Sequence, residues 1–323
     1  MSDITLQTVD LYAHYKTRNN DTIYAVDGVN ISLKRGQILG IAGESGCGKS
    51  TLANCLMGCF FKPLYYGSGA LFIDGVDVVG LDPEVFRTEY LGKKIAYIPQ
   101  AAMNTLNPTL KIRDFILDVL KEHKPNLSRA EMIEMAEQRF ETLGLEKKIL
   151  NAYPNELSGG MKQRTVIAIS TILNPKVLIA DEPTSALDVT SQKRVIYLLK
   201  SLLEQGVVES IVFITHELPL LYHVANEIAI MYAGQIMELG TSREMVFEPI
   251  HPYAKALMGS IIVPELDMKD HKLFAIPGAP PNLKEKLSGC RFYERCSERV
   301  PQCIENDIDM KTTGQRSHRC IRY

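Results

Sequence analysis

The sequence lacks any long hydrophobic run. None of its 323 residues lies in a stretch that approaches 18 consecutive apolar side chains, so we expect no membrane-spanning helix. The start, MSDITLQTVDLYAHY, lacks the basic-then-apolar pattern of a secretory signal, which predicts a cytoplasmic protein. If the chain works at a membrane, we therefore expect partner proteins to bring it there.

An excess of charge of either sign is also lacking. The 36 basic and 38 acidic residues leave a formal net charge of −2, which gives no electrostatic argument for a nucleic-acid partner. The sequence contains no internal repeat, no low-complexity tract and no C-x2-C pair. Three of the seven cysteines lie in or shortly after a Gly-rich loop, and the other four lie within the last 34 residues. In a reducing cytosol, such a C-terminal group indicates metal before disulfides.

Apolar patterns predict an α/β fold. Residues 4–13 and 24–34 alternate apolar and polar side chains, as half-buried strands do. Continuous apolar runs predict buried parallel strands, and helical periodicity between two of them implies right-handed crossovers. Those runs are 37–42, 177–180 and 210–214, and the helical segment between the last two is 190–204. Ser128 and Glu131 have capping-box spacing and predict a helix over 128–143. Frequent prolines after residue 249 place a domain boundary near 255.

Residues 43–50, GESGCGKS, fit the phosphate-loop pattern G-x-x-x-x-G-K-[ST]. Glycines let the backbone fold around phosphate oxygens, and the following helix adds its positive end. Lys49 is predicted to hold the β- and γ-phosphates, and the Ser50 hydroxyl to ligate Mg²⁺. A chance match in a Gly-containing turn is the alternative, which the preceding apolar run disfavours. The predicted nucleotide contacts are Gly43, Ser45, Gly46, Cys47, Gly48, Lys49, Ser50 and Thr51.

Two adjacent carboxylates follow the buried run at 177–180. Asp181 is placed to bind Mg²⁺, and Glu182 to orient or deprotonate an attacking water. A solvated acidic turn is the alternative for this pair. His216 follows the next apolar run, although a lone histidine is more often structural.

Residues 157–164, LSGGMKQR, resemble the signature motif of the ABC (ATP-binding cassette) family. Gln100 in Ile98-Pro99-Gln100 resembles the Q-loop of that family, Ser185-Ala186-Leu187-Asp188 the D-loop and His216 the switch histidine. The resemblance implies a P-loop NTPase cassette over 1–255, with a RecA-like core, an antiparallel β subdomain and a helical subdomain at about 101–160.

The ABC resemblance also implies how the site works. Two cassettes bind ATP head to tail, so Ser158 and Gly160 would contact ATP held by a second, homologous subunit. Glu182, His216 and Gln100 would be catalytic, and Ser50, Gln100 and Asp181 would hold Mg²⁺. Adenine would stack on Tyr15, with Tyr24 as the alternative. An inactive regulatory cassette is disfavoured because Lys49 and the catalytic residues are present.

The C-terminal segment resembles that of oligopeptide/dipeptide importer ATPases. The matching motifs there are His251-Pro252-Tyr253, Ile276-Pro277-Gly278 and Gly289-Cys290-Arg291-Phe292. Leu106-Asn107-Pro108, just after the Q-loop, resembles the same subfamily. The resemblance implies an extension over 256–323 whose four cysteines, Cys290, Cys296, Cys303 and Cys320, bind a [4Fe–4S] cluster. Zinc and two disulfides are the alternatives.

The same resemblance implies the partners and the location of the chain. The partners are a second cassette, two transmembrane permease subunits and an extracytoplasmic substrate-binding protein. The chain itself would lie at the cytoplasmic face of the cell membrane. Oligosaccharide or nickel is the alternative cargo. A soluble ABC ATPase acting on nucleic acid or ribosomes is the alternative class, and we expect no nucleic-acid partner.

Overall fold

The computed structural model describes residues 3–185, 187–260, 276–285, 287–314 and 316–323. The chain divides into two compact units. Unit 1 comprises residues 1–6, 34–36 and 73–212, and unit 2 comprises residues 7–33, 37–72 and 213–323. The boundary predicted near residue 255 falls inside unit 2, which contains both the Gly-rich loop and the cysteine-rich C-terminal region.

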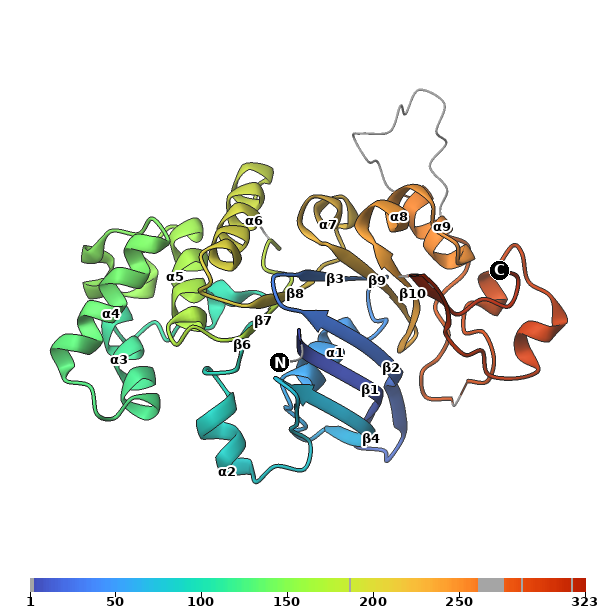
Figure 1. Ribbon diagram of the computed structural model, residues 1–323, viewed down its shortest axis with the longest axis horizontal. Helices are drawn as coiled ribbons and strands as arrows, with labels where there is room; N and C mark the ends of the chain where they lie inside the picture. Colours follow the sequence, from blue (N-terminus) through green and yellow to red (C-terminus); the bar gives the residue numbers. More distant parts are fainter. Residues whose placement is uncertain (1–2, 186, 261–275, 286, 315) are drawn as a thin grey trace. The chain divides into compact units, whose positions relative to one another are not determined.

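Unit 1 contains two parallel strands and a group of helices. Strands β6 (Ile95–Ile98) and β7 (Val177–Asp181) pair in parallel, with Ile98 opposite Ala180. Every residue of β7 is buried, as the continuous apolar run predicts. Helix α4 (Arg129–Thr142) packs against both α3 (Ile112–His123) and α5 (Gly159–Thr171) (Figure 1).

The predicted capping box begins α4. The Ser128 hydroxyl accepts from the Glu131 N–H at 3.3 Å, and the Glu131 carboxylate accepts from the Ser128 N–H at 2.7 Å. Helix α6 (Val189–Glu204) confirms the helical segment expected at 190–204. The shorter elements of unit 1 are β5 (Val76–Asp77), α2 (Pro83–Val85), a π-helical turn (Phe86–Tyr90) and 3-10 turns at Ala102–Asn104, Lys147–Asn151 and Pro154–Glu156.

Unit 2 is built on a mixed sheet. Strand β3 (Ile38–Ala42) is completely buried and pairs in parallel with β9 (Glu227–Tyr232), which pairs antiparallel with β10 (Gln235–Thr241). Two short C-terminal strands, β12 (Arg316–His318) and β11 (Lys311–Thr313), extend the sheet beyond β10. The C-terminal region thus adds strands to the sheet that carries the Gly-rich loop. The unit boundary falls within the buried strand β8 (Ser210–Ile214).

Three helices cover this sheet. Helix α7 (Leu218–Val224) packs on β3, α8 (Ser242–Phe247) on β9 and β10, and α9 (Pro252–Gly259) on β10 (Figure 1). A second sheet contains β2 (Thr22–Lys34), β1 (Ile4–Lys16) and β4 (Leu64–Ile73) in that order, so both predicted N-terminal strands are confirmed. Short 3-10 turns at Tyr293–Arg295 and Pro301–Ile304 lie in the cysteine-rich region.

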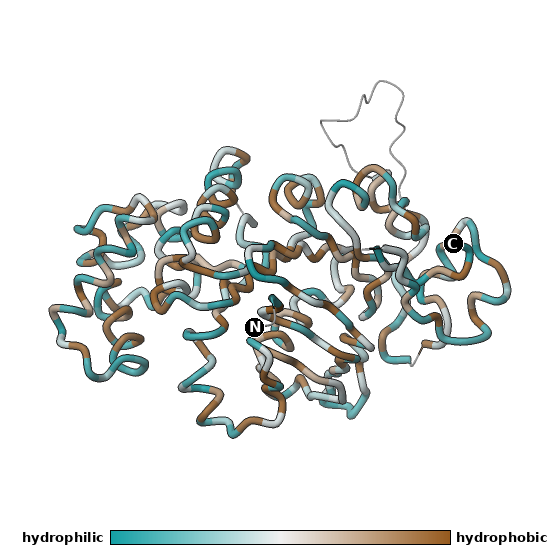
Figure 2. Tube along the Cα trace, viewed as in Figure 1, coloured by the Kyte–Doolittle hydropathy of each residue, from teal (hydrophilic) through white to brown (hydrophobic). Residues whose placement is uncertain are grey.

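Hydrophobic and hydrophilic residues are mixed along the helices and also along β1 and β2 (Figure 2). Among the described residues, no helix is both long enough and apolar enough to cross a membrane. Buried apolar residues come from strands and helices alike, such as Ile41 of β3 and Phe140 of α4, so both kinds of element supply the core.

Candidate active site

The Gly-rich loop of unit 2 joins β3 to α1 (Lys49–Leu56). Gly43 has a φ of +155°, and a Cβ there would lie 2.1 Å from the Met231 carbonyl oxygen. Gly48 has a φ of +110°, and a Cβ there would lie 2.3 Å from the Ala25 carbonyl oxygen. Both distances are far below van der Waals contact, so any side chain would push the loop away from β9 or β2. Close backbone approach therefore explains two glycines of the motif.

Lys49 is buried, and its ammonium group turns back onto the loop. Its Nζ donates to the carbonyl oxygens of Gly43 at 2.7 Å and Glu44 at 2.9 Å. The helix begins at this residue, and the N–H groups of a first helical turn have no carbonyl partner within the helix. An ammonium group and a helix N-terminus thus occur together, which is the combination that binds phosphate oxygens.

The two candidate adenine residues have different surroundings. The Tyr15 hydroxyl lies 3.2 Å from Oγ1 of Thr51, in the first turn of α1. The backbone N–H of Tyr24 donates to the Leu283 carbonyl oxygen at 2.9 Å. Tyr15 therefore contacts the helix that follows the phosphate loop, whereas the backbone of Tyr24 contacts the C-terminal region.

The carboxylates of unit 1 lie at the end of β7. Asp181 is only 1% exposed, and its Oδ2 accepts a hydrogen bond from the Tyr97 hydroxyl at 3.1 Å. Glu182 Oε2 accepts from Nε2 of Gln100 at 3.0 Å. Glu182 has a φ of +47°, a left-handed conformation that is strained for a residue other than glycine and is concentrated at functional sites. Unit 1 thus brings together two of the predicted catalytic residues, Gln100 and Glu182.

The LSGGMKQR segment begins α5. Ser158 is the N-cap, its hydroxyl accepts from the Met161 N–H at 3.4 Å, and Ser158 and Gly160 are both exposed. In the second turn of the helix, the buried Gln163 donates from Nε2 to the Pro183 carbonyl oxygen at 2.7 Å. The exposed helix N-terminus and the turn after Glu182 are therefore linked by one side chain.

The remaining predicted residues lie as follows. His216 is exposed in unit 2, directly after β8. Asp188 is the N-cap of α6 and accepts from the N–H groups of Thr190 and Ser191, each at 3.0 Å. A hydrogen bond from the Ser191 hydroxyl at 2.7 Å, together with these backbone bonds, stabilises the charged carboxylate and lowers the pKa of Asp188. Ala186, at the centre of the predicted D-loop, lies outside the described residues.

Comparison with known proteins identifies the family. Residues 26–185 match the family described as ABC transporter, and residues 237–303 match the one described as Oligopeptide/dipeptide transporter, C-terminal region. The chain is 38% identical to the oligopeptide transport ATP-binding protein OppD of Escherichia coli strain K12, over 99% of this chain and 94% of the relative. The chain belongs to the oligopeptide/dipeptide transporter branch of the ABC family. The predictions of an ABC ATPase and of this branch are therefore confirmed.

A second relative of this ABC ATPase and a solved structure support the same family assignment. The oligopeptide transport ATP-binding protein OppF of the same E. coli strain is 34% identical, over 99% of this chain and 96% of the relative. A dimeric structure of the ATP-binding cassette MJ0796, in a post-hydrolysis state bound to ADP and Pi, matches with a TM-score of 0.64 and 29% identity. That match covers 74% of this chain and 99% of the solved one, which confirms the cassette fold.

The four C-terminal cysteines of the ABC protein line one small cavity, together with His251. Each of the seven cysteines is a free thiol, so the disulfide alternative is not observed. Burial, reinforced by the neighbouring cysteines, raises the pKa of Cys290 to about 12. In the part of the chain that the structure describes, no group of three or more His, Cys, Asp or Glu side chains could hold a metal ion. The [4Fe–4S] cluster therefore stays a prediction.

Some residues of the site were missed by sequence analysis. Gln163 lies within the LSGGMKQR segment, whereas Tyr97 lies three positions before Gln100, just outside the Ile98-Pro99-Gln100 motif. Glu44 occupies a variable position of the phosphate-loop pattern. Its partners, Tyr253 and Arg295, come from the C-terminal region, and no local pattern links them to the loop.

Proposed function

We propose that this ABC ATPase energises the uptake of oligopeptides or dipeptides across a membrane. The observation that carries the proposal is the C-terminal region, because residues 237–303 match the oligopeptide/dipeptide transporter description. Two relatives that align with almost the whole chain are named for oligopeptide transport, which supports the same cargo. Oligosaccharides and nickel remain the alternative cargoes. A soluble role on nucleic acid finds no support in a net charge of −2.

ATP is bound chiefly by the Gly-rich loop in this proposal. Lys49 holds the β- and γ-phosphates, and Tyr15 stacks on adenine. The other contacts of the loop are made by Gly43, Ser45, Gly46, Cys47, Gly48, Ser50 and Thr51. The position of Lys49 Nζ against the carbonyl oxygens of its own loop supports the first role. Ser50, Gln100 and Asp181 would hold Mg²⁺, which when bound neutralises charge on the phosphate oxygens.

Hydrolysis requires a base and a sensor of the γ-phosphate. Glu182 orients the attacking water and accepts its proton, while the water oxygen bonds to the γ-phosphorus and the bridging bond to ADP breaks. The hydrogen bond from Gln100 to Glu182 supports a shared task for this pair. His216 acts as the switch histidine.

A second cassette completes the site. Ser158 and Gly160 are exposed at the start of α5, as residues that contact ATP held by another subunit must be. OppD and OppF of one organism are both relatives, which supports a pair of homologous cassettes. Two permease subunits would hold this pair at the cytoplasmic face of the membrane, and a binding protein would deliver cargo.

The C-terminal cysteines are proposed to bind a [4Fe–4S] cluster. Four free thiols line one cavity, and burial raises the pKa of Cys290, Cys296 and Cys320, so their thiolates persist there only with a compensating cation. A cluster, when bound, supplies that positive charge and cross-links the region from Cys290 to Cys320. Zinc is the alternative, and the metal and sulfide content of anaerobically purified protein distinguishes the two.

Transport by the reconstituted complex tests the function. Proteoliposomes with the permeases and the binding protein are expected to accumulate labelled peptide on addition of ATP, but neither oligosaccharide nor Ni²⁺. Glu182→Gln is expected to slow ATP hydrolysis by at least about 100-fold while ATP still binds, because the proton acceptor is lost. Glu204→Gln, at the exposed end of α6, is the matched control. Turnover by Glu182→Gln at the wild-type rate would refute the catalytic assignment, and exclusive uptake of another cargo would refute the peptide assignment.

A further inference from the structure

Glu44, the second residue of the Gly-rich loop, has all of its polar groups engaged. Its N–H donates to the Tyr253 hydroxyl oxygen at 3.0 Å, and its carbonyl oxygen accepts from Lys49 Nζ at 2.9 Å. Its carboxylate accepts two hydrogen bonds from Arg295, Nη1 to Oε2 at 2.6 Å and Nη2 to Oε1 at 2.9 Å. One loop residue therefore contacts both the phosphate-binding lysine and the C-terminal region.

Contacts other than the one with Glu44 also hold Arg295 in place. Its side chain is only 5% exposed, its Nε donates to the Pro277 carbonyl oxygen at 2.7 Å, and Nη1 also donates to the Tyr232 hydroxyl at 3.1 Å. Its guanidinium carbon lies 5.7 Å from the centre of the Tyr232 ring and 5.8 Å from that of Phe292. A bidentate, stacked guanidinium has one geometry, so Arg295 fixes the Glu44 carboxylate.

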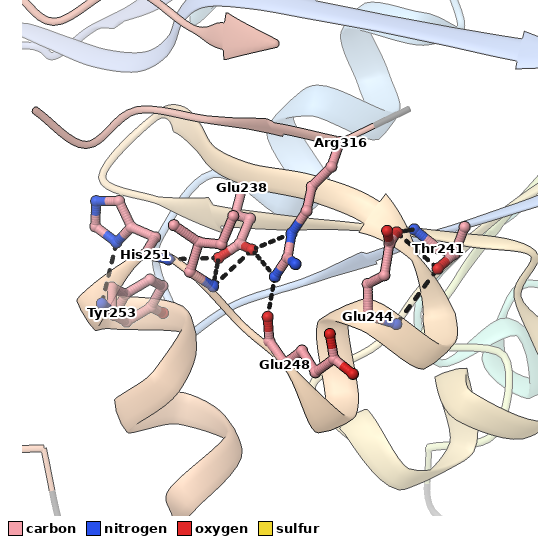
Figure 3. Close-up of polar contacts among 8 residues, drawn as sticks. Glu238, Thr241, Glu244, Glu248, His251, Tyr253 and Arg316 are labelled. Atoms are coloured by element: carbon pink, nitrogen blue, oxygen red, sulfur yellow. Dashed lines mark hydrogen bonds and ion pairs between the residues drawn. The ribbon is translucent and has the colours of Figure 1, made fainter. Parts of the chain in front are cut away.

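Tyr253 is equally well anchored, through the residues before it. His251 caps α9 by accepting the Tyr253 N–H at Nδ1, at 3.0 Å (Figure 3). The completely buried Glu238 carboxylate accepts from the N–H groups of Ile250 at 2.9 Å and His251 at 2.7 Å. The Tyr253 ring is buried, with its centre 4.5 Å from that of Tyr232. The His-Pro-Tyr segment thus directs one hydroxyl to the backbone of the phosphate loop.

We propose that Tyr253 and Arg295 are positioning residues for ATP binding, which hold the phosphate loop through Glu44. Tyr253 fixes the loop backbone, and Arg295 fixes the side chain of Glu44 and neutralises its charge. The inference requires only that the chain binds ATP, and it is independent of the cargo and of the cysteine cluster.

The charge of Glu44 separates this role from a purely structural one. The carboxylate belongs to a loop that receives a polyanion, and Arg295 is its bidentate partner. Removal of Arg295 leaves an uncompensated negative charge on the loop, which repels the phosphates. Removal of both charges relieves the repulsion although the contact is still absent. ATP affinity should therefore be lower in Arg295→Met than in the double variant Arg295→Met/Glu44→Gln.

Equilibrium titration of the full-length chain with a fluorescent ATP analogue tests the proposal. Arg295→Met is expected to weaken ATP binding about tenfold. Arg295→Lys, which keeps the charge but cannot make the bidentate contact with Glu44, is expected to weaken it about threefold. The double variant should bind within about threefold of wild type. In the assembled transporter, KM for ATP should rise in the same order while kcat at saturating ATP is kept. Arg299→Met is the matched control, because exposed Arg299 donates to the Glu294 carbonyl oxygen.

Tyr253→Phe is the milder second variant. It keeps the ring packing and removes only the hydroxyl that accepts the Glu44 N–H, so binding should weaken about threefold with unchanged circular dichroism. Wild-type affinity in both Arg295→Met and Tyr253→Phe would overturn the proposal. So would a double variant that binds no better than Arg295→Met, because the defect would then be structural. Failure of the wild-type chain to bind the analogue would refute the ATPase assignment instead.

Discussion

The buried carboxylate of Glu238 allows a stringent test of how the C-terminal region is attached. It is 0% exposed and accepts from two backbone N–H groups and from Arg316, through Nε at 3.0 Å and Nη2 at 2.7 Å (Figure 3). The perturbation is Glu238→Ala. It leaves Arg316, whose side chain is 12% exposed, without its carboxylate, and leaves the N–H groups of Ile250 and His251 without acceptors.

The expected loss of stability follows from the contacts that Glu238→Ala removes. Removal of one partner of a buried ion pair typically destabilises a protein by about 3–5 kcal/mol, because the other charge stays buried without compensation. Arg316 still donates to the Glu248 carbonyl oxygen, which favours the lower end of that range. We therefore expect Glu238→Ala to lower the free energy of unfolding by about 3 kcal/mol. Glu238→Met/Arg316→Met, which removes both charges, should cost less than Glu238→Ala alone.

The control residue is Glu244 of α8, which is drawn in the same view (Figure 3). Glu244 accepts from the Thr241 N–H at 2.9 Å and hydroxyl at 2.7 Å in the capping box of α8, so Glu244→Ala should cost about 1 kcal/mol (Figure 3). Urea unfolding is followed by far-ultraviolet circular dichroism for the whole chain, and by release of a fluorescent ATP analogue for unit 2. Equal losses in Glu238→Ala and Glu244→Ala would refute the reasoning, since burial would then make no difference.

Two further predictions concern the cysteine cavity and its histidine. Cys303→Ser should reduce bound iron and sulfide to less than about half of wild type, because one of four thiolate ligands is lost, whereas Cys59→Ser outside the cavity should not. Equal iron content in both variants would contradict the four-cysteine assignment. Burial lowers the pKa of His251 to about 3, so between pH 6.5 and 3 only the unfolded chain takes up this proton, and stability falls as the pH falls. His251→Asn should reduce that slope by about 1.4 kcal/mol per pH unit in urea titrations, and an unchanged slope would count against it.

Local features of the fold were predictable because they depend on neighbouring residues. The completely buried strand β3 was predicted from a continuous apolar run, and the start of α4 from Ser128 and Glu131. The Gly-rich loop was predicted together with its lysine. Its glycines could not be explained further, because the backbone oxygens of Met231 and Ala25 that exclude a Cβ come from strands distant in the sequence.

Contacts between distant segments were not predictable. The pattern of apolar residues in a sequence indicates which face of a helix or strand is buried, but not which residues pack against that face. Gln100 and Glu182 were both assigned to the site, although nothing in their motifs predicts their hydrogen bond across 82 positions. Arg295 lies between Cys290 and Cys296 and belongs to no motif. The boundary predicted near residue 255 assigns it to a different domain from the loop that it contacts.

The sequence by itself determined the family and the chemistry of this protein, since each motif is a short segment whose backbone and side chains act together. Residues 43–50, 157–164 and 181–182 identify an ABC ATPase on that basis. Only the tertiary structure decided that the C-terminal region contacts the phosphate loop, through a hydrogen bond between residues 251 positions apart. That pairing depends on how β9, α9 and the cysteine-rich segment pack, and packing is a property of the whole unit.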